Sequence, residues 1–170
     1  MVASSDIMLK SSRELPMLVH DDVKDALIRV LSECIADGIG QLCTGALLKR
    51  PAGTLIVRRA LSDDYLPGLY ELPGGGMEQG ESIVDCLRRE MVEETSVIVT
   101  HIDALCPSFD YTSSSGRRVR QINFVVRGDG EIRLEPSEHD SLLYISKPSD
   151  LDGLQMSSES RRVLVEALRA

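Results

Sequence analysis

The sequence predicts a protein of the α/β (α+β) class, built on a mixed β-sheet flanked by helices. Strand-like runs and segments with helical periodicity interleave along the 170 residues. They do not alternate as regular βαβ units, which favours a mixed sheet over a purely parallel one. Apolar residues make up 42% of the chain and charged residues 27%, an ordinary composition for one globular domain with its own core.

The charge and the apolar pattern exclude several classes of protein. The net charge is −8, whereas a general nucleic-acid-binding protein needs a basic surface for the phosphate backbone. The N-terminus lacks the apolar core of a signal peptide, and no run approaches the ~20 apolar residues that span a bilayer. We therefore expect a cytoplasmic protein without nucleic-acid or membrane partners. The sequence leaves open whether it is a monomer or a homodimer.

The cysteines are scattered along the chain without the paired spacing of a zinc site. We expect them to be reduced and mostly buried thiols, as in a cytoplasmic protein. The four are Cys34, Cys43, Cys86 and Cys106.

Residues 1–18 are expected to form a flexible arm, and residues 19–170 a single domain that begins with a helix at 21–37. Two aspartates suit the start of this helix, and Gly38 lies just past its end. Apolar residues recur in it at helical spacing, at Val23, Leu27, Val30, Leu31, Cys34 and Ile35.

The rest of the chain alternates between strand-like runs and two more helices. Runs at 41–49 and 54–60 are separated by a turn at Pro51–Gly53. A loop with a short extended piece at 69–72 leads into a helix that begins near Ser82. Further strands are expected at 97–102, 118–126, 131–134 and 142–145, before a last helix that starts at Ser157 or Ser158.

The helix that begins near Ser82 carries three glutamates close to its C-terminal end, Glu90, Glu93 and Glu94. With about 100° per residue, Glu94 and Glu93 fall about 40° and 60° to either side of Glu90. The apolar stripe of this helix is centred about 90° away, on Val84, Leu87 and Met91. The carboxylates therefore border the buried face of the helix rather than its solvated face.

This arrangement is locally unfavourable. Glu90 and Glu94 are a like-charge pair four residues apart, and all three acids lie where the helix dipole is negative. One interpretation is a charged face with partial salt bridges, because Arg89 can pair with Glu93. The other is a site for a hard cation such as Mg²⁺, which takes oxygen ligands and removes the repulsion. The glycine run at 74–76, which lets the backbone turn sharply beside a ligand, favours the second.

This stretch resembles the signature of the Nudix hydrolases, G-x5-E-x7-R-E-U-x-E-E-x-G-U, where U is a bulky apolar residue. Its specified positions are occupied by Gly75, Glu81, Arg89, Glu90, Met91, Glu93, Glu94 and Val97. The one departure is Ser96, which stands where the family has glycine. Because the glycine that ends a helix is often left-handed, we expect Ser96 to affect stability rather than chemistry. The resemblance covers roughly residues 40–169.

The resemblance implies a Nudix-type α/β/α sandwich around a mixed sheet, here with an extra N-terminal helix. It implies hydrolysis of a nucleoside diphosphate linked to another group, such as a nucleoside triphosphate or a related nucleotide, with Mg²⁺ or Mn²⁺ as cofactor. It also implies that Gly75, Glu81 and Arg89 fix the glycine loop against the helix. The implied metal ligands are Glu90, Glu93, Glu94, the carbonyl of Gly74 and, from a later loop, Glu138.

Two carboxylates are candidates for the general base that takes a proton from the attacking water. They are Glu93 and Glu138, and the sequence does not choose between them. His139, which follows Glu138, is expected to be a loop residue rather than a ligand.

Residues that bind the substrate lie outside the signature. Arg59 aligns with a family arginine, which implies a phosphate contact, and strand alternation turns Arg58 to the opposite face. Tyr111, with Phe109, is a candidate for stacking on a base, and a packing role is equally compatible with the sequence. Relatives that read oxidised guanine use an asparagine near the start of the last helix, where this chain has serines.

A second function, from a different class, is a catalytically silent Nudix-like module that binds a nucleotide as a sensor. Such modules usually lose carboxylates of the signature, whereas this chain keeps them all. The enzyme is therefore the preferred interpretation, and metal-dependent turnover would separate the two.

Overall fold

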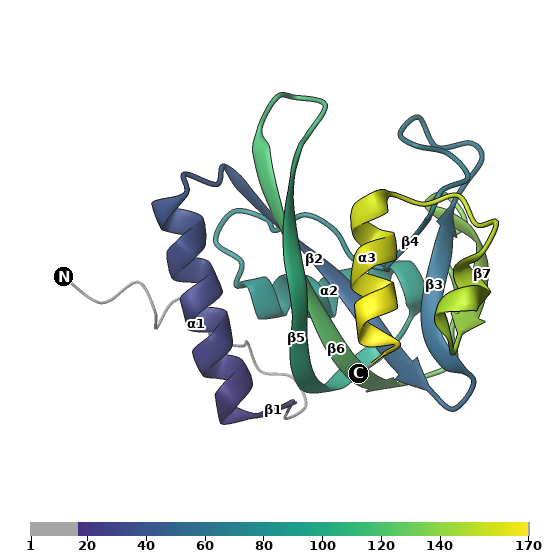
Figure 1. The fold of residues 1–170 in the computed structure, drawn as a ribbon, viewed down its shortest axis with the longest axis horizontal. Coiled ribbons are helices and arrows are strands. Elements are labelled where there is room, and N and C mark those ends of the chain that lie inside the picture. The colour runs from purple at the N-terminus through teal and green to yellow at the C-terminus, as the bar shows by residue number, and fades with distance from the viewer. Residues whose placement is uncertain (1–16, 170) are drawn as a thin grey trace.

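The computed structural model describes residues 17–169 (Figure 1). Most of the expected arm, residues 1–16, lies outside the described residues. The first element is β1 (Leu18–Val19), which pairs in parallel with β5 (Ile98–Thr112). Sheet pairing therefore begins at Leu18, inside the segment that we expected to be an arm.

A seven-stranded sheet runs through the molecule in the order β1-β5-β6-β2-β3-β4, with β7 paired to β3. β2 runs parallel to β6 and antiparallel to β3, and β5 and β6 are antiparallel. These pairs confirm the mixed sheet that the sequence predicts. The remaining strands are β2 (Gln41–Arg50), β3 (Gly53–Arg59), β4 (Tyr70–Glu71), β6 (Arg118–Asp129) and β7 (His139–Ile145).

Helices cover both faces of this sheet (Figure 1). Side chains alternate along β3, so that Leu55 and Val57 join the core that includes the two helices α1 and α2, whereas Ile56 joins the core that includes α3. This layering confirms the α/β/α sandwich, with α1 as the additional N-terminal helix. The helices are α1 (Asp21–Ala36), α2 (Ile83–Thr95) and α3 (Ser158–Ala167), and a 3₁₀ turn, η1 (Pro148–Leu151), precedes α3.

Two expected strands differ from the structure. The strand expected at 97–102 continues through a long antiparallel ladder with β6 to Thr112. The strand expected at 131–134 is wrong, because this segment lies at the C-terminal end of α2 instead of pairing in the sheet. The amides of Arg133 and Glu135 donate to the carbonyls of Thr95 and Glu94, at 3.0 and 3.1 Å. They satisfy carbonyls that a helix leaves without an intrahelical partner.

Both ends of α2 are capped by serines. At the N-terminus, Ser82 accepts a hydrogen bond from the amide of Asp85 at 3.0 Å. At the C-terminus, Ser96 has a φ of 59°, in the left-handed region where the family has glycine. Its amide donates to the carbonyl of Val92 at 2.9 Å. Ser96 therefore adopts the left-handed conformation that is common for the glycine at the end of a helix.

The cysteines and the surface agree with the composition. All four cysteines are free, and Cys34, Cys43 and Cys86 are buried, which confirms the expected unpaired thiols.

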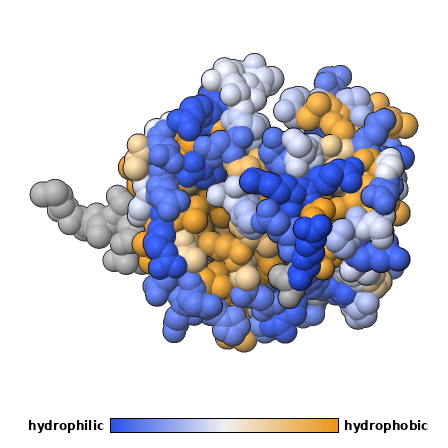
Figure 2. Space-filling model, in the orientation of Figure 1, coloured by the Kyte–Doolittle hydropathy of each residue, from blue (hydrophilic) through white to orange (hydrophobic). Residues whose placement is uncertain are grey.

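Within residues 17–169, the helices are too short or too polar to cross a bilayer. Figure 2 shows apolar surface in the area between α1 and β5.

Candidate active site

The glycine run passes tightly between β2 and α2. Gly74 has a φ of 142°, and a Cβ on it would lie 2.3 Å from the carbonyl oxygen of Thr44. A Cβ on Gly75 would lie 2.6 Å from the carboxylate of Glu90. The amide of Thr44 in turn donates to the carbonyl of Gly75 at 2.9 Å. Only glycine lets the backbone lie against the strand while a glutamate from the helix reaches it.

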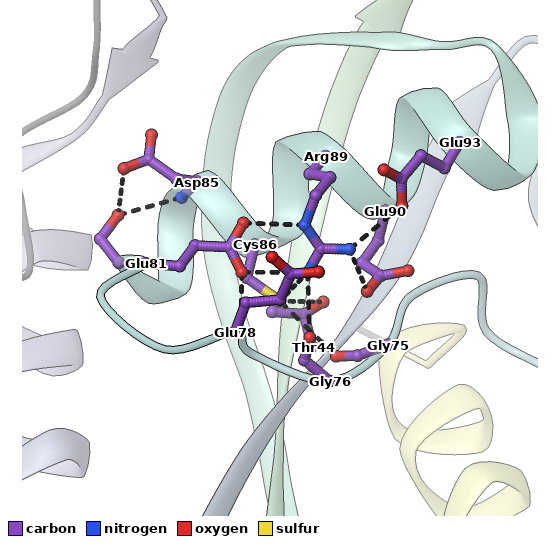
Figure 3. Close-up of polar contacts among 11 residues, drawn as sticks. Thr44, Gly75, Gly76, Glu78, Glu81, Asp85, Cys86, Arg89, Glu90 and Glu93 are labelled. Carbon is purple, nitrogen blue, oxygen red and sulfur yellow. Dashed lines mark hydrogen bonds and ion pairs between the residues drawn. The ribbon is translucent and has the colours of Figure 1, made fainter.

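Arg89 connects the glycine run to the glutamates of the signature before and on α2 (Figure 3). Its Nε and Nη2 donate to the two carboxylate oxygens of Glu81, each at 2.9 Å, and Nη2 also donates to the carbonyl of Gly76 at 2.9 Å. Its Nη1 donates to Glu90 at 2.7 Å and to Glu93 at 3.1 Å. The hydrogen bond from Arg89 holds the pKa of Glu81 below its usual range. These contacts support the structural roles that the resemblance implies for Glu81 and Arg89.

The three helix glutamates have different surroundings. Glu94 is 5% exposed and accepts a hydrogen bond from the amide of Gly74 at 2.7 Å. Burial raises the pKa of Glu94 to about 9, and it also raises the pKa of Glu90. The side chain of Glu93 is 55% exposed. Burial therefore disfavours the charged form of two of these carboxyl groups, whereas the third is open to solvent.

Glu138 lies beside these acids, and so does a residue that the sequence did not single out as a ligand. A carboxylate oxygen of Glu94, one of Glu138 and a ring nitrogen of His139 all lie within 4.8 Å of one another. Glu138 is exposed, whereas His139 is 2% exposed. The expectation of a loop residue at 139 is wrong, since His139 begins β7 and pairs with Arg59 of β3. The only signal in the sequence was its place next to Glu138.

The donor set fits a divalent cation. A cation would offset the burial of charge at Glu90 and Glu94, and oxygen ligands from carboxylates are those that Mg²⁺ and Mn²⁺ prefer. The group whose candidate ligand atoms lie within 4.8 Å of one another contains Glu94 and Glu138 but not Glu90 or Glu93. Both of the latter bind Nη1 of Arg89. A cation held by all four glutamates would therefore compete with Arg89 for two of them.

The two neighbouring arginines of β3 have separate partners. Arg58 donates to Asp140 at 2.7 Å. Arg59 donates from Nη1 to Glu71 at 2.9 Å, from Nε to the carbonyl of Tyr65 at 2.7 Å, and from Nη2 to Asp63. Its guanidinium also lies over the ring of Tyr65, 5.5 Å from the centroid. Arg59 thus binds protein groups in this structure, and its contact with a substrate phosphate stays a prediction.

A cleft of about 230 Å³ adjoins the acids. Tyr111 and Phe109 line it, with ring centroids 6.3 Å apart, as do Tyr65 and Leu66 from the loop after β3. Glu71 also lines this cleft and lies 3.2 Å from Nε2 of His139, which connects it to the acidic group. The candidate stacking residues therefore lie in a cleft that Glu71 and His139 connect to the candidate metal ligands.

The sequence did not indicate Gln121 or Asn123 as residues of the site. Gln121 lines the cleft and donates to Oδ1 of Asn123 at 2.9 Å. Asn123 is fully buried and donates in turn to the carbonyl of Pro107 at 2.7 Å. Ser157 and Ser160, at the start of α3, line the cleft as well. No sequence pattern marked Gln121, because its position depends on the pairing of β6 with its neighbours.

Comparisons with known proteins agree with this geometry. A profile of the NUDIX domain matches residues 41–164. A comparison with curated protein sequences gives no match. The MutT NUDIX hydrolase from Burkholderia pseudomallei has a TM-score of 0.62 at 22% identity, over 73% of this chain and 95% of that one. The ORF135 protein of E. coli has a TM-score of 0.62 at 25% identity, over 76% and 91%. An ADP-ribose pyrophosphatase from Streptococcus suis has a TM-score of 0.54 at 22% identity, over 76% and 92%.

Proposed function

The chain belongs to the family of Nudix hydrolases, whose domain it matches over residues 41–164, and from this premise we propose a specific activity. It is a divalent-metal-dependent pyrophosphohydrolase that cleaves a nucleoside diphosphate linked to another group, either a nucleoside triphosphate or a related nucleotide. The family includes hydrolases such as MutT and ADP-ribose pyrophosphatase, so the leaving group is what remains to be identified.

One observation carries this proposal. Glu90 and Glu94 are buried against the glycine run, where burial raises the pKa of both carboxyl groups. Because burial disfavours the charged form of both groups, the arrangement is unfavourable when both are ionised and no cation is bound. A site that is unfavourable without a cation is typical of a functional centre rather than of a structural one.

Glu90, Glu93, Glu94 and Glu138 would hold the cation, with the carbonyl of Gly74 as a further proposed ligand. Mg²⁺ or Mn²⁺ bound there would neutralise charge on the pyrophosphate oxygens and make nearby water more acidic. Arg89 binds Glu90 and Glu93 through Nη1 and would have to share them with the cation, whereas Gly74 orients Glu94 through its amide.

The proton of the attacking water goes to an exposed carboxylate. Glu93 and Glu138 are the two acids of the group that are open to solvent, and a general base must reach the water that it activates. Glu94, which is buried and hydrogen-bonded to Gly74, is better placed to bind a cation than to exchange protons with solvent.

The aromatic cleft would hold the nucleoside. Its volume of about 230 Å³ accommodates a base between the ring pair of Phe109 and Tyr111 and the loop that carries Tyr65. With the base there, the phosphates extend past Glu71 toward the acids. The phosphate contact proposed for Arg59 would require it to exchange one of its present partners, Glu71 or Asp63, for the substrate.

A substrate panel tests this proposal. Nucleoside triphosphates, nucleotide sugars, ADP-ribose and dinucleotides would each be incubated with the protein, with and without Mg²⁺ or Mn²⁺, and phosphate and pyrophosphate release compared. We expect metal-dependent turnover of at least one class. Glu93→Gln and Glu94→Gln should lose most of it, while Glu33→Gln, on the exposed face of α1, should retain it. Binding of a nucleotide without any turnover would contradict the enzyme and favour a sensor.

A further inference from the structure

His139 is a buried imidazole with an unused nitrogen. Its side chain is 1% exposed. Among the described residues, its Nδ1 is the one buried side-chain nitrogen or oxygen that lacks a hydrogen-bond partner. Buried polar groups are nearly always paired, so an orphan beside a candidate active site indicates a partner that is bound during function.

The hydrogen bond of the other ring nitrogen, Nε2, indicates what kind of partner Nδ1 requires. Nε2 lies 3.2 Å from Oε1 of Glu71, and the same oxygen accepts a hydrogen bond from Arg59 at 2.9 Å. An ionised carboxylate paired with an arginine only accepts, so Nε2 carries the proton. In the neutral imidazole Nδ1 then has a lone pair, which requires a donor or a cation.

The neighbours of His139 favour a cation. A ring nitrogen lies within 4.8 Å of carboxylate oxygens of Glu94 and Glu138, and no hydrogen bond connects them. Neither carboxyl group is hydrogen-bonded to Nδ1, whereas a cation placed between the three groups would contact all of them at once. A histidine that binds a metal through one nitrogen commonly donates the other N–H to a carboxylate, as His139 does to Glu71.

We propose that His139 is a nitrogen ligand of a divalent cation held together with Glu94 and Glu138. This inference rests on the proposed function and makes it more specific, because it changes the expected metal. An imidazole favours later first-row transition metals such as Co²⁺, whereas a site made only of oxygen suits Mg²⁺. The site therefore prefers a transition metal more strongly than its glutamates alone would, with Glu71 orienting the imidazole.

The test reads the metal directly and needs no turnover. Mn²⁺ would be bound to the full chain, and pulsed electron paramagnetic resonance used to look for hyperfine coupling to an imidazole nitrogen. We expect this coupling in the unmodified protein. Calorimetric titrations with Co²⁺ and Mg²⁺ would then compare it with His139→Asn, which offers an oxygen near the position of Nδ1. We expect the variant to lose at least about tenfold in affinity for Co²⁺ and much less for Mg²⁺.

His101→Asn is the matched control, because His101 contacts Thr100 on β5 and lies outside the acidic group. It should leave both affinities unchanged. Absence of nitrogen coupling in the unmodified protein would overturn the inference whether or not His139→Asn folds. If such a protein still hydrolysed nucleotides with Mg²⁺, the proposed function would stand alone, whereas failure to bind any divalent cation would remove both.

Discussion

Arg89 and Glu81 form a two-point ion pair, in which Nε and Nη2 each lie 2.9 Å from a different carboxylate oxygen. Both side chains are largely buried, at 24% and 14% exposed. Because Nη2 also binds the carbonyl of Gly76, this pair closes the loop between the glycine run and α2. The position of the candidate metal ligands thus depends on a residue that contacts no substrate in the proposed mechanism.

Arg89→Lys should therefore destabilise the protein and weaken its site. Lysine cannot present the planar fork that binds two oxygens of Glu81 and a carbonyl together. We expect a loss of about 1–3 kcal/mol in the free energy of unfolding, measured by urea denaturation. Arg127→Lys is the control, because Arg127 makes a similar two-point pair with Asp103 but is 52% exposed. It should cost less than about 1 kcal/mol, and an equal loss in both variants would contradict the role of Arg89.

Glu94→Gln should stabilise the metal-free protein at high pH. The pKa of Glu94 rises from 4.5 to about 9 on folding, so the folded state binds more protons than the unfolded state between these values. The free energy of unfolding therefore falls as the pH rises through this window. Glutamine stays neutral and can still accept from Gly74. We expect the variant to melt above the unmodified protein at pH 8–9, where the carboxylate begins to lose its proton, with the gap closing toward pH 5.

Thermal melting from pH 5 to 9, without metal, measures this gap. Glu93→Gln is the matched control, because it removes a carboxylate that is largely exposed. Its melting temperature should follow that of the unmodified protein across the range. With a saturating divalent cation the order should reverse, because only the unmodified site gains the full binding energy. Identical melting of Glu94→Gln and the unmodified protein at every pH would show that folding does not raise the pKa of Glu94.

Local patterns predicted the elements that depend on neighbours in sequence. The helical spacing of Val84, Leu87 and Met91 correctly placed the buried face of α2, and the glutamates lie at its edge. The same kind of reasoning gave a wrong strand at 131–134. Ile132 and Leu134 alternate and pack on the core, as in a strand, but the amides of Arg133 and Glu135 cap the end of α2. The alternation of apolar residues predicts which side chains are buried, but it does not predict which carbonyl accepts the hydrogen bond from a backbone amide.

The parts of the site that the sequence missed depend on pairing between distant segments. His139 and Glu71 come within 3.2 Å because β7 and β4 both pair with β3. Neither residue belongs to the signature, and 68 positions separate them along the chain. The signature itself was predictable, since its spacing encodes one loop and one helix. The cleft could not be predicted in the same way, because its lining residues come together only when distant strands pair in the sheet.

Ser96→Gly should leave the protein equally stable or stabilise it by up to about 1 kcal/mol. Ser96 has a φ of 59°, which costs a residue with a Cβ more than it costs glycine. The side chain makes one long contact, 3.4 Å from Oγ to the carbonyl of Arg133. Ser96→Ala keeps the strained Cβ and loses this contact, so it should be no more stable than the unmodified protein. Urea denaturation of the three forms checks this order, and a clear loss with glycine would contradict it.

Tyr111→Leu should raise the KM for the preferred nucleotide about tenfold, since stacking on a base contributes roughly 1–3 kcal/mol. Tyr111→Phe keeps the ring and loses only the hydrogen bond from the hydroxyl to Sγ of Cys43, which is 3.4 Å long. We expect its KM to change by less than about threefold. Tyr144→Leu, at a partly exposed tyrosine outside the cleft, serves as the control. Steady-state kinetics would measure all three, and an unchanged KM in Tyr111→Leu would remove the stacking role.

Arg59→Ala should raise the KM by an order of magnitude or more. The free energy of unfolding of the variant shows whether Arg59 also has a structural role. If Arg59 binds only a substrate phosphate, a lost charge-assisted hydrogen bond of ~1.5–3 kcal/mol appears in KM alone. Its contacts with Glu71, Asp63 and the carbonyl of Tyr65 indicate a second role, since they hold the loop that walls the cleft. We therefore expect KM to rise and the free energy of unfolding to fall together.

Two further variants test the assignment of Arg59. Arg59→Lys should recover only part of the loss, because an ammonium group cannot reach three partners in the plane of a guanidinium. Arg58→Ala removes a comparable ion pair, with Asp140, at the adjacent position of β3 and should change KM much less. The ladder between β3 and β7 shifts register between these two arginines, so strand alternation does not decide which of them contacts the phosphate. The kinetics of the two alanine variants decide it. A damaging Arg58→Ala with a silent Arg59→Ala would move the phosphate contact to Arg58.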